Sequence, residues 1–504
     1  MSLFLKKPIS TLLAESAESE KSLKRTLTAG SLIALGIGAI IGAGLFVRTA
    51  AAAAQNAGPS VTYGFIVAAI GCALAGLCYA ELSSSIPIAG SAYTYSYATM
   101  GELIAWIIGW DLILEYAVGA ATVGIAWSEY LNRLLGDVLG IAEIPYQWCH
   151  SPFQHSGDMH GIINLPALFI VIILTMLLIR GTQESALVNG IIVITKVAIV
   201  ILIIILGWQF IKPENHTPYI PVATTYVDHE GISHNFGGIM GILGAAGVVF
   251  FAFIGFDAVS TTAQEAKNPK RDMPIGILGS LAICTVLYIL FAHVLTGIAT
   301  TEDFRTSGKE ASVVFAINKY MIGYGWLGKL VTVAILAGFS SVILVMLLGQ
   351  SRVFYSMSRD GLLPKVFSDI HPKYKTPYKA SWFILILVGL FAAFVPGDIV
   401  GDMTSIGTLF AFMLVCVAVI ILRKTDPGLK REFKTPWVPF VPILGIIVCG
   451  AMIFGLGWTN WLRLIVWLLI GFVIYFGYSK KNSVLQNKAL TGGTDNLSDS
   501  SRIK

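Results

Sequence analysis

The sequence is short of charged residues. Asp, Glu, Lys and Arg make up 12% of its 504 residues, while 55% are hydrophobic; a soluble protein carries about 25% charged residues. Apolar runs such as 167–179, 191–206 and 382–395 approach the roughly 20 residues that span a bilayer. The chain is therefore expected to be a multi-pass membrane protein, and its net charge of +5 gives no sign of nucleic-acid binding.

Three further absences narrow the class of protein to which the chain can belong. The N-terminal 25 residues have no short apolar stretch with a cleavage site, so no signal peptide is predicted. Five of the six cysteines fall in apolar runs and only Cys149 falls in a loop, so no disulfide framework is implied. No Cys/His metal spacing and no nucleophile–base pattern is visible, so we expect no enzyme, no metal and no cofactor.

Apolar segments recur along the chain, and each is expected to be a helix because backbone groups in lipid must be paired within their own segment. We count about twelve spans in an all-α membrane protein. Their approximate bounds are 28–54, 60–86, 96–132, 162–180, 186–211, 237–264, 275–299, 327–358, 379–396, 401–422, 438–458 and 460–478.

Lys and Arg positions predict the orientation. With twelve spans, the basic N-terminus and the basic loops at 267–271, 359–379 and 423–434 fall on one side. The loops on the opposite side are poorer in positive charge. We therefore expect both termini to be cytoplasmic in a plasma-membrane protein, with a cytoplasmic segment at 1–27 and a disordered cytoplasmic tail at 479–504.

Glycines crowd the first span, at positions 36, 38, 42 and 44. A dinucleotide fingerprint is excluded because the spacing is GxGxxxG and no strand precedes it. Two hypotheses stay open: close helix packing through Gly38 and Gly42, or an unwound segment whose free backbone amides bind an anion.

The sixth span carries Gly255 and Asp257 in mid-membrane, five segments after the first glycine cluster. Interrupted helices at corresponding positions of two halves are typical of the binding site in transporters built from inverted repeats. The halves would be 28–211 and 237–422, together a transport core at 28–422, with spans 11 and 12 at 438–478.

Five stretches resemble the cationic amino acid transporter family of the amino acid–polyamine–organocation superfamily, in a bacterial form. They are GIGAIIGAGLF (36–46), YAELSSSIPIAGSAYTYSY (79–97), FFAFIGFD with VSTTAQE (250–265), NPKRDMP (268–274) and GQSRVFYSMSRDGLLP (349–364). The resemblance implies a five-plus-five inverted repeat of the leucine-transporter type, with discontinuous helices 1 and 6.

The same resemblance implies where a substrate binds. It puts the substrate carboxylate on the backbone at Gly42, Ala43 and Gly44. It puts the substrate ammonium on carbonyls near Ile40, Phe251, Ala252 and Ile254. Many relatives have Ser or Thr at the position of Ala43, so this chain lacks a side-chain hydroxyl there.

Lys196 lies in the middle of the fifth span. A lysine at a helix centre costs ~2.5–3.5 kcal/mol on insertion scales, so it is expected to face the interior; snorkelling is the alternative. In sodium-independent relatives such a lysine resembles a substitute for sodium, near a carbonyl around Gly38 and a hydroxyl of Ser340 or Ser341. We expect Lys196 to carry the coupling proton, because desolvated lysines release protons readily.

Other side chains are candidates for tuning the pocket. Phe253 and Phe339 would line it, with plain packing as the alternative. Glu115 and Tyr116 lie in the third span beside the site. Asp257 is expected either to tune the pocket or to cap the second half-helix, since carboxylates suit helix N-termini.

The apolar pocket favours neutral, alanine-like amino acids carried by alternating access with proton coupling. A carrier of Arg or Lys, and an amino-acid exchanger, stay open as alternatives. Polyamines lack the carboxylate that the glycine break suits. A channel or a purely regulatory binding protein finds no support in the sequence. Partners beyond substrate, protons and lipid, such as a second copy or a small helix, are not indicated.

Overall fold

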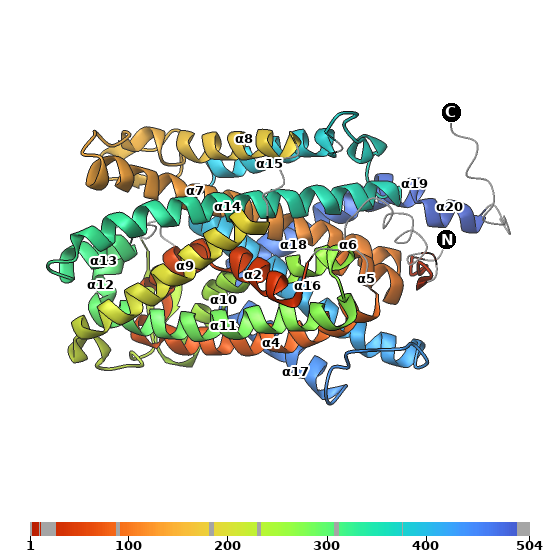
Figure 1. Cartoon of the computed structure of the whole chain (residues 1–504), viewed down its shortest axis with the longest axis horizontal. Helices are drawn as coiled ribbons and strands as arrows, with labels where there is room; N and C mark the ends of the chain where they lie inside the picture. The colour runs from red at the N-terminus through yellow and green to blue at the C-terminus, as the bar shows by residue number, and fades with distance from the viewer. Residues whose placement is uncertain are drawn as a thin grey trace.

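The computed structural model describes residues 3–9, 11, 27–86, 91–180, 186–228, 233–306, 312–374 and 376–490. It is mostly helical. Figure 1 shows the long helices α4 (Val61–Ser85), α11 (Pro269–Ile298) and α14 (Gly325–Arg359) running along the longest axis of the molecule.

Each of the twelve apolar segments contains a helix. Those not yet named are α2 (Ala29–Ile40), α6 (Glu102–Ile113), α7 (Gly119–Arg133), α8 (Leu165–Ile179), α9 (Ala186–Gly207), α10 (Gly238–Phe250), α15 (Tyr378–Phe394), α16 (Gly397–Thr425), α17 (Phe440–Gly455) and α18 (Trp458–Ile474).

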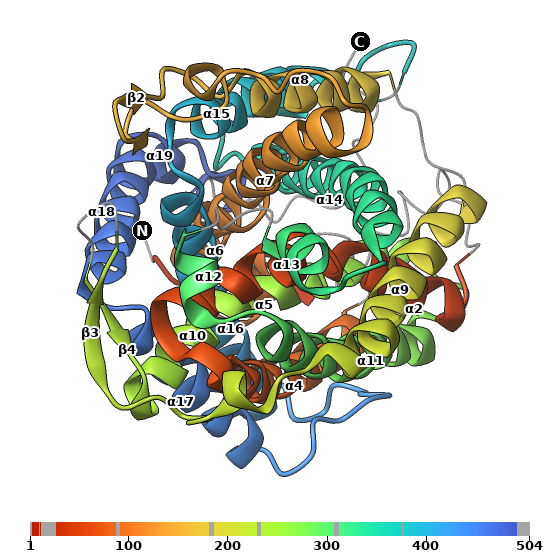
Figure 2. The same cartoon turned by 90° about the vertical axis from the view of Figure 1, so that its left-hand side faces the viewer.

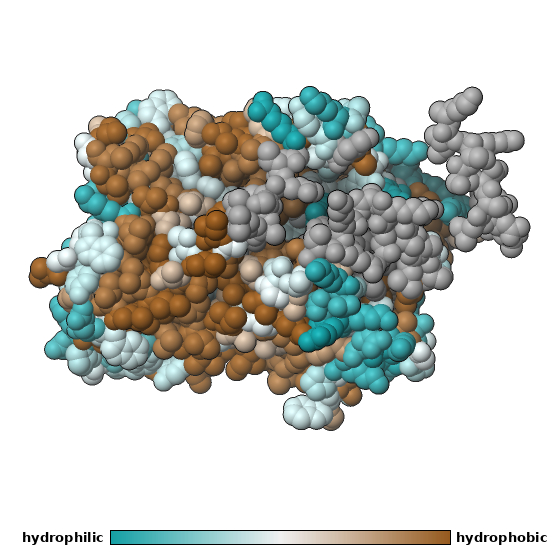
Figure 3. All heavy atoms as spheres, viewed as in Figure 1, coloured by the Kyte–Doolittle hydropathy of each residue, from teal (hydrophilic) through white to brown (hydrophobic). Residues whose placement is uncertain are grey.

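Within the described residues, eight helical stretches are long and apolar enough to cross a membrane, and α2, α8, α15 and α17 are shorter apolar helices. Figure 3 shows apolar side chains over most of one face, with hydrophilic ones gathered mainly towards the two ends. Such a surface suits a helical protein that crosses a bilayer.

The first span is interrupted. α2 ends at Ile40, and Ile41 is extended (φ −73°, ψ 105°). After the break the chain resumes as a right-handed helical segment made of a π-helical turn η1 (Gly44–Arg48), α3 (Thr49–Ala52) and a second π-helical turn η2 (Ala53–Ala57). The helix therefore ends near the middle of the first span, at the glycine cluster, instead of continuing through it.

The sixth span is interrupted too. After α10 comes a 3₁₀ turn, η9 (Phe251–Phe253), and then an extended Ile254 (φ −60°, ψ 137°). Gly255 has φ +111°, a conformation that favours glycine, and the chain continues as the 3₁₀ segment η10 (Asp257–Glu265).

The third span begins later than predicted. The expected bound was 96, but α5 (Ser91–Thr99) is a separate helix and Gly101, with φ +93°, directs the chain into α6. A π-helical turn, η4 (Leu114–Val118), joins α6 to α7. Apolar composition could not show this corner, because α5 is itself rich in aromatic residues.

Short elements complete the chain. The hairpins pair β1 (His155–Ser156) with β2 (Met159–His160) and β3 (Thr224–Val227) with β4 (Ser233–Phe236), both antiparallel. The short helices and turns are η3 (Gly58–Ser60), η5 (Leu134–Val138), η6 (Tyr146–Trp148), η7 (Trp208–Phe210), η8 (Pro213–His216), α12 (Thr301–Thr306), α13 (Ser312–Tyr320), η11 (Lys365–Ser368), η12 (Tyr475–Ser479), α19 (Lys480–Asn482) and α20 (Val484–Leu490).

The C-terminal segment differs from the expected disordered tail. Residues up to 490 form η12, α19 and α20, and side chains of this segment are bonded to the bundle. The expectation that disorder starts at 479 is therefore wrong for 479–490, while 491–504 lie outside the described residues. Most of the segment 1–27 also lies outside them.

The helices enclose the two interruptions. Viewed down the long axis, α8 and α15 lie at one side of the bundle and α17 at the other (Figure 2). α4 packs against α10 and α11, α11 also packs against α2, and η1 packs against η9. The two breaks thus meet inside the protein, where all residues of both are buried.

Candidate functional site

The two interrupted helices touch at their breaks. A Cβ atom added to Gly44 would lie 2.2 Å from the Cα of Ala252, and one added to Gly255 would lie 3.1 Å from the carbonyl oxygen of Ala39. Glycine at these positions lets the two backbones approach without an intervening side chain. The sequence thus brings backbone groups of both halves of the chain to one place.

Backbone groups at the first break are available for a ligand. The Gly42 carbonyl accepts hydrogen bonds from the amides of Leu45 (3.2 Å) and Phe46 (3.4 Å) and so starts the second half-helix. In the described part of the chain, the amides of Gly42 and Ala43 donate to no other backbone group. Such amides at a helix start attract an anion.

Carbonyls at the two breaks supply the opposite polarity. Ile40 is the last residue of α2, so its carbonyl is one of those that have no partner within the helix. The Phe251 carbonyl is used locally, since it accepts from the amide of Ile254 at 3.3 Å. The carbonyls of Ile40 and Ala252 both accept from the hydroxyl of Tyr288, each at 3.0 Å. The sequence reasoning missed Tyr288.

A small cavity adjoins the first break. Its volume is about 10 Å³, near the minimum for one water molecule, so a larger ligand requires the site to open. It brings together three predicted residues, Gly42, Lys196 and Phe339. The full lining is Ile41, Gly42, Phe46, Lys196, Ile199, Ala334, Ile335, Gly338 and Phe339.

Phe339 and Phe253 lie in different surroundings. Phe339, on α14, lines the cavity and packs edge-on against Tyr130, with 5.5 Å between ring centroids. Phe253 lies away from the cavity lining and packs against Phe65 and Tyr288, with centroid separations of 6.3 and 5.3 Å. Of the two rings, only that of Phe339 faces the cavity.

Lys196 points inward from α9. Its side chain is buried, and its ammonium donates to the Gly38 carbonyl at 2.9 Å. A Cβ on Gly338 would lie 2.9 Å from the Lys196 Cε, so α14 passes directly against the lysine. Snorkelling is not the observed arrangement.

The two candidate serines of α14 differ. The Ser340 hydroxyl donates to the Leu336 carbonyl of its own helix at 2.9 Å. The Ser341 hydroxyl is buried, with no hydrogen-bond partner among the described residues. Ser341 is therefore the better candidate for a group that gains a partner when the site is occupied.

Glu115, Tyr116 and Asp257 are buried beside the breaks. Glu115 and Tyr116 lie in the π-helical turn η4, a feature often found at functional sites. The Tyr116 hydroxyl donates to the Asp257 carboxylate at 2.6 Å. Asp257 is the first residue of η10, where a carboxylate suits the helix start, but the described contacts show no side-chain cap there. Its carboxylate joins η10 to the third span through Tyr116.

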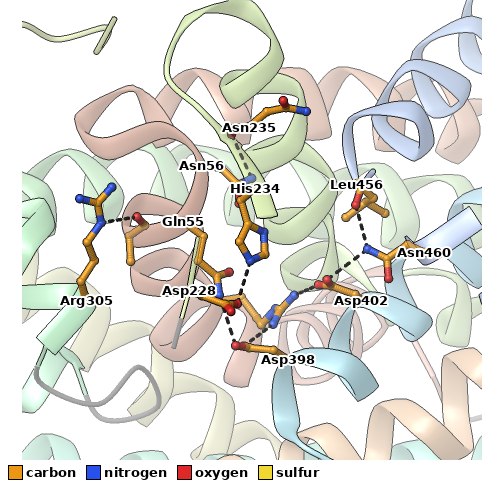
Figure 4. A network of polar contacts seen from close by, with 12 residues as sticks. Gln55, Asn56, Asp228, His234, Asn235, Arg305, Asp398, Asp402, Leu456 and Asn460 are labelled. Carbon is orange, nitrogen blue, oxygen red and sulfur yellow. Dashed lines mark hydrogen bonds and ion pairs between the residues drawn. The ribbon is translucent and has the colours of Figure 1, made fainter. Parts of the chain in front are cut away.

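A polar network ties the second half of the broken first span to other helices (Figure 4). Arg48 in η1 forms ion pairs with Asp398 (3.2 Å) and Asp402, both on α16. Gln55 also donates to Asp398, at 3.3 Å, and Asn460 of α18 donates to Asp402 at 3.3 Å. The sequence analysis overlooked Arg48, although a charge inside an apolar span is itself a functional signal.

Comparisons with known proteins relate the chain to permeases. The family model described as amino acid permease matches residues 27–488. The chain is 46% identical to the branched-chain amino acid permease BcaP of Bacillus subtilis (strain 168), and the match covers 96% of this chain and 99% of that protein.

Two other relatives differ in what their names say they carry. The methylthioribose transporter of Bacillus subtilis (strain 168) is 41% identical, over 96% of this chain and 99% of that protein. The vacuolar cationic amino acid transporter 4 of Arabidopsis thaliana is 28% identical, over 96% of this chain and 97% of that protein. These relatives are permeases or transporters and not enzymes, in agreement with the prediction.

Proposed function

Since the chain belongs to the amino acid permease family, we propose that it is a secondary active transporter that takes up neutral amino acids by alternating access. The observation that carries this proposal is the meeting of the two breaks, with Gly44 packed directly on Ala252. Backbone donors and acceptors converge there in the centre of the bundle.

The substrate backbone is a zwitterion, and both of its charges find partners at the breaks. The carboxylate binds the amides of Gly42, Ala43 and Gly44, where the positive end of a half-helix begins. The ammonium binds carbonyls at the ends of the other half-helices. The predicted set is Ile40, Phe251, Ala252 and Ile254; of these, the Phe251 carbonyl already has a backbone donor.

The substrate side chain enters the apolar cavity. Phe339 and Ile199 line it, and the Lys196 ammonium lies at its wall, so a positively charged side chain is disfavoured. Similarity to a branched-chain amino acid permease supports neutral substrates from alanine to leucine in size. Transport of Arg or Lys is the alternative that the Arabidopsis relative supports.

We assign the coupling role to Lys196. Its ammonium stands at the Gly38 carbonyl, next to the first break, where a bound cation would also stabilise the end of α2. Loading and release of a proton there would change that interaction and bias the half-helix. Transport is then driven by protons and independent of sodium, with exchange of amino acids as the alternative.

The broken first and sixth spans support a five-plus-five inverted repeat, with twelve spans in all. The repeats are 28–211 and 237–422. Basic residues concentrated in the loops on the side of the termini support cytoplasmic ends in the plasma membrane.

Uptake into proteoliposomes tests the proposal. Labelled leucine, alanine, arginine and methylthioribose are offered with an inward proton gradient, with a sodium gradient, or with internal amino acid alone. We expect leucine and alanine to accumulate with protons and without sodium. Uptake only in the presence of internal amino acid would make the protein an exchanger, and uptake of methylthioribose alone would refute amino-acid transport.

A further inference from the structure

Tyr288 connects the two broken helices. It lies on α11 and is fully buried. Its hydroxyl is 3.0 Å from the carbonyl oxygen of Ile40, at the end of α2, and 3.0 Å from that of Ala252, in η9. One phenolic oxygen therefore faces both breaks at once, although its partners are 248 and 36 residues away along the chain.

This hydroxyl leaves the two carbonyls only partly satisfied. A tyrosine hydroxyl has one proton, whereas each carbonyl oxygen has two lone pairs. The proton is shared between Ile40 and Ala252, so acceptor capacity remains on both. An ammonium group brings three donors and can use that capacity without removing the hydroxyl.

The position of the hydroxyl is fixed by its ring. The Tyr288 ring packs against Phe65 of α4 and Phe253 of η9, with centroid separations of 5.6 and 5.3 Å. Aromatic pairs in these tilted and edge-on geometries are stabilising. Because the ring is packed on two sides, the hydroxyl oxygen stays in place. It can therefore position the two carbonyls before a ligand binds.

We propose that Tyr288 is a positioning residue that holds the Ile40 and Ala252 carbonyls at the spacing of one substrate ammonium and so makes the site selective for amines. The proposal rests on the amino-acid site proposed above and adds the group that shapes its cationic end. The hydroxyl keeps the carbonyls together in the empty site, and the ammonium then binds to their remaining lone pairs. A ligand with a carboxylate and no amine gains nothing from this arrangement.

The test separates the ammonium from the rest of the ligand. L-leucine and 4-methylpentanoate, which is leucine without its amino group, compete against labelled leucine uptake in proteoliposomes containing wild-type or Tyr288→Phe protein; alanine and propanoate are the second pair. In Tyr288→Phe we expect the advantage of leucine over 4-methylpentanoate to fall about tenfold, the size of one hydrogen bond to a charged group. The inhibition constant of 4-methylpentanoate should change less than twofold.

A purely structural tyrosine would weaken both ligands in the same proportion, and an unchanged ratio would overturn the proposal. Tyr130→Phe is the matched control, because the Tyr130 hydroxyl is buried with no partner in the described part of the chain, and it should keep the wild-type ratio. If Tyr288→Phe does not fold, Phe65→Leu loosens the ring while keeping the hydroxyl, and the ratio should fall severalfold. Wild-type protein that transports neither amino acid would refute the proposed function first.

Discussion

At the scale of single residues, the approach of two backbones depends on the absence of one side chain. Gly44 lies against the Cα of Ala252, which is main chain and cannot rotate away. Glycine costs helix stability, about 1 kcal/mol relative to alanine, and here that cost is offset by a contact that no other residue allows. The same approach places the amides of one half of the chain beside the carbonyls of the other.

We predict that Gly44→Ala destabilises the protein by about 3 kcal/mol, the upper range for overpacking, and abolishes uptake, because the added Cβ would force the breaks apart. Thermal unfolding in detergent and leucine uptake measure the two effects. The matched control is Gly190→Ala on α9, where an added Cβ meets no atom within 4 Å. Equal unfolding temperatures for the two variants would contradict the account.

At the scale of elements, the half-helix after the first break is held by charge. Arg48 is 2% exposed and carries two carboxylate partners from α16. Removing one partner of a buried pair costs 3–5 kcal/mol, because the remaining charge is left uncompensated. The network therefore joins η1 to α16 through charges that are each costly to remove alone.

Arg48→Met should lower the free energy of unfolding by about 3–5 kcal/mol, since Asp398 and Asp402 lose their cation. The triple variant with Asp398→Asn and Asp402→Asn should recover most of that loss, because no buried charge remains unpaired. Chemical or thermal unfolding of the three proteins measures this. A triple variant less stable than Arg48→Met would show that the charges are not coupled.

The connection between α11 and α14 contains a buried carboxylate, that of Asp303 in α12. Burial alone would raise the pKa of the Asp303 carboxyl, but hydrogen bonds from Lys319, Tyr320 and Thr300 prevail and lower that pKa below its ordinary value. A lowered folded-state pKa means that the stabilisation is present above the unfolded value, about 3.9, and is lost as pH falls through the folded value.

Asp303→Asn should therefore lower the unfolding temperature at pH 7, and the difference from wild type should shrink progressively below about pH 4. Glu302→Gln is the control, because that side chain is largely exposed and its ion pair with Arg305 is long, at 3.5 Å. A difference that stays constant from pH 7 to pH 3 would exclude this contribution.

The helices were largely predictable from the sequence, whereas the side-chain contacts between helices were not. Lipid requires apolar helices, so each of the twelve apolar runs contains one. The glycine cluster of the first span and Gly255 of the sixth marked the two interruptions. Lys196 was expected near Gly38 from the family resemblance, and its ammonium lies there. No pattern linked Tyr288 to positions 40 and 252, because only the tertiary packing of α11 brings that hydroxyl to both breaks.

At the scale of the whole molecule, described segments near both ends of the chain converge on one buried carboxylate, that of Glu102. Glu102 is fully buried and accepts hydrogen bonds from the side chains of Tyr97, Tyr475, Ser483 and Gln486. Its backbone amide donates to the Leu5 carbonyl at 3.0 Å. The N-terminal and C-terminal segments are thus joined to the start of the third span.

Truncation after Asn482 should destabilise the protein by about 3 kcal/mol, because Glu102 then loses two of its donors, each worth roughly 1.5–3 kcal/mol to a charged group. Truncation after Leu490 retains every one of these hydrogen bonds and serves as the control. Unfolding temperature in detergent distinguishes the two proteins. Identical stability would mean that solvent replaces the lost donors.

In the mechanism proposed for the whole molecule, an amino acid binds at the two breaks and Lys196 couples its movement to protons. The most direct measurement compares proton-driven leucine accumulation in wild-type and Lys196→Met proteoliposomes, with Thr195→Val as a control, since that hydroxyl donates only to the Ile191 carbonyl of its own helix among the described contacts. The account predicts at least a tenfold loss of accumulation in Lys196→Met and wild-type behaviour in Thr195→Val. Full proton-driven accumulation in Lys196→Met would contradict it.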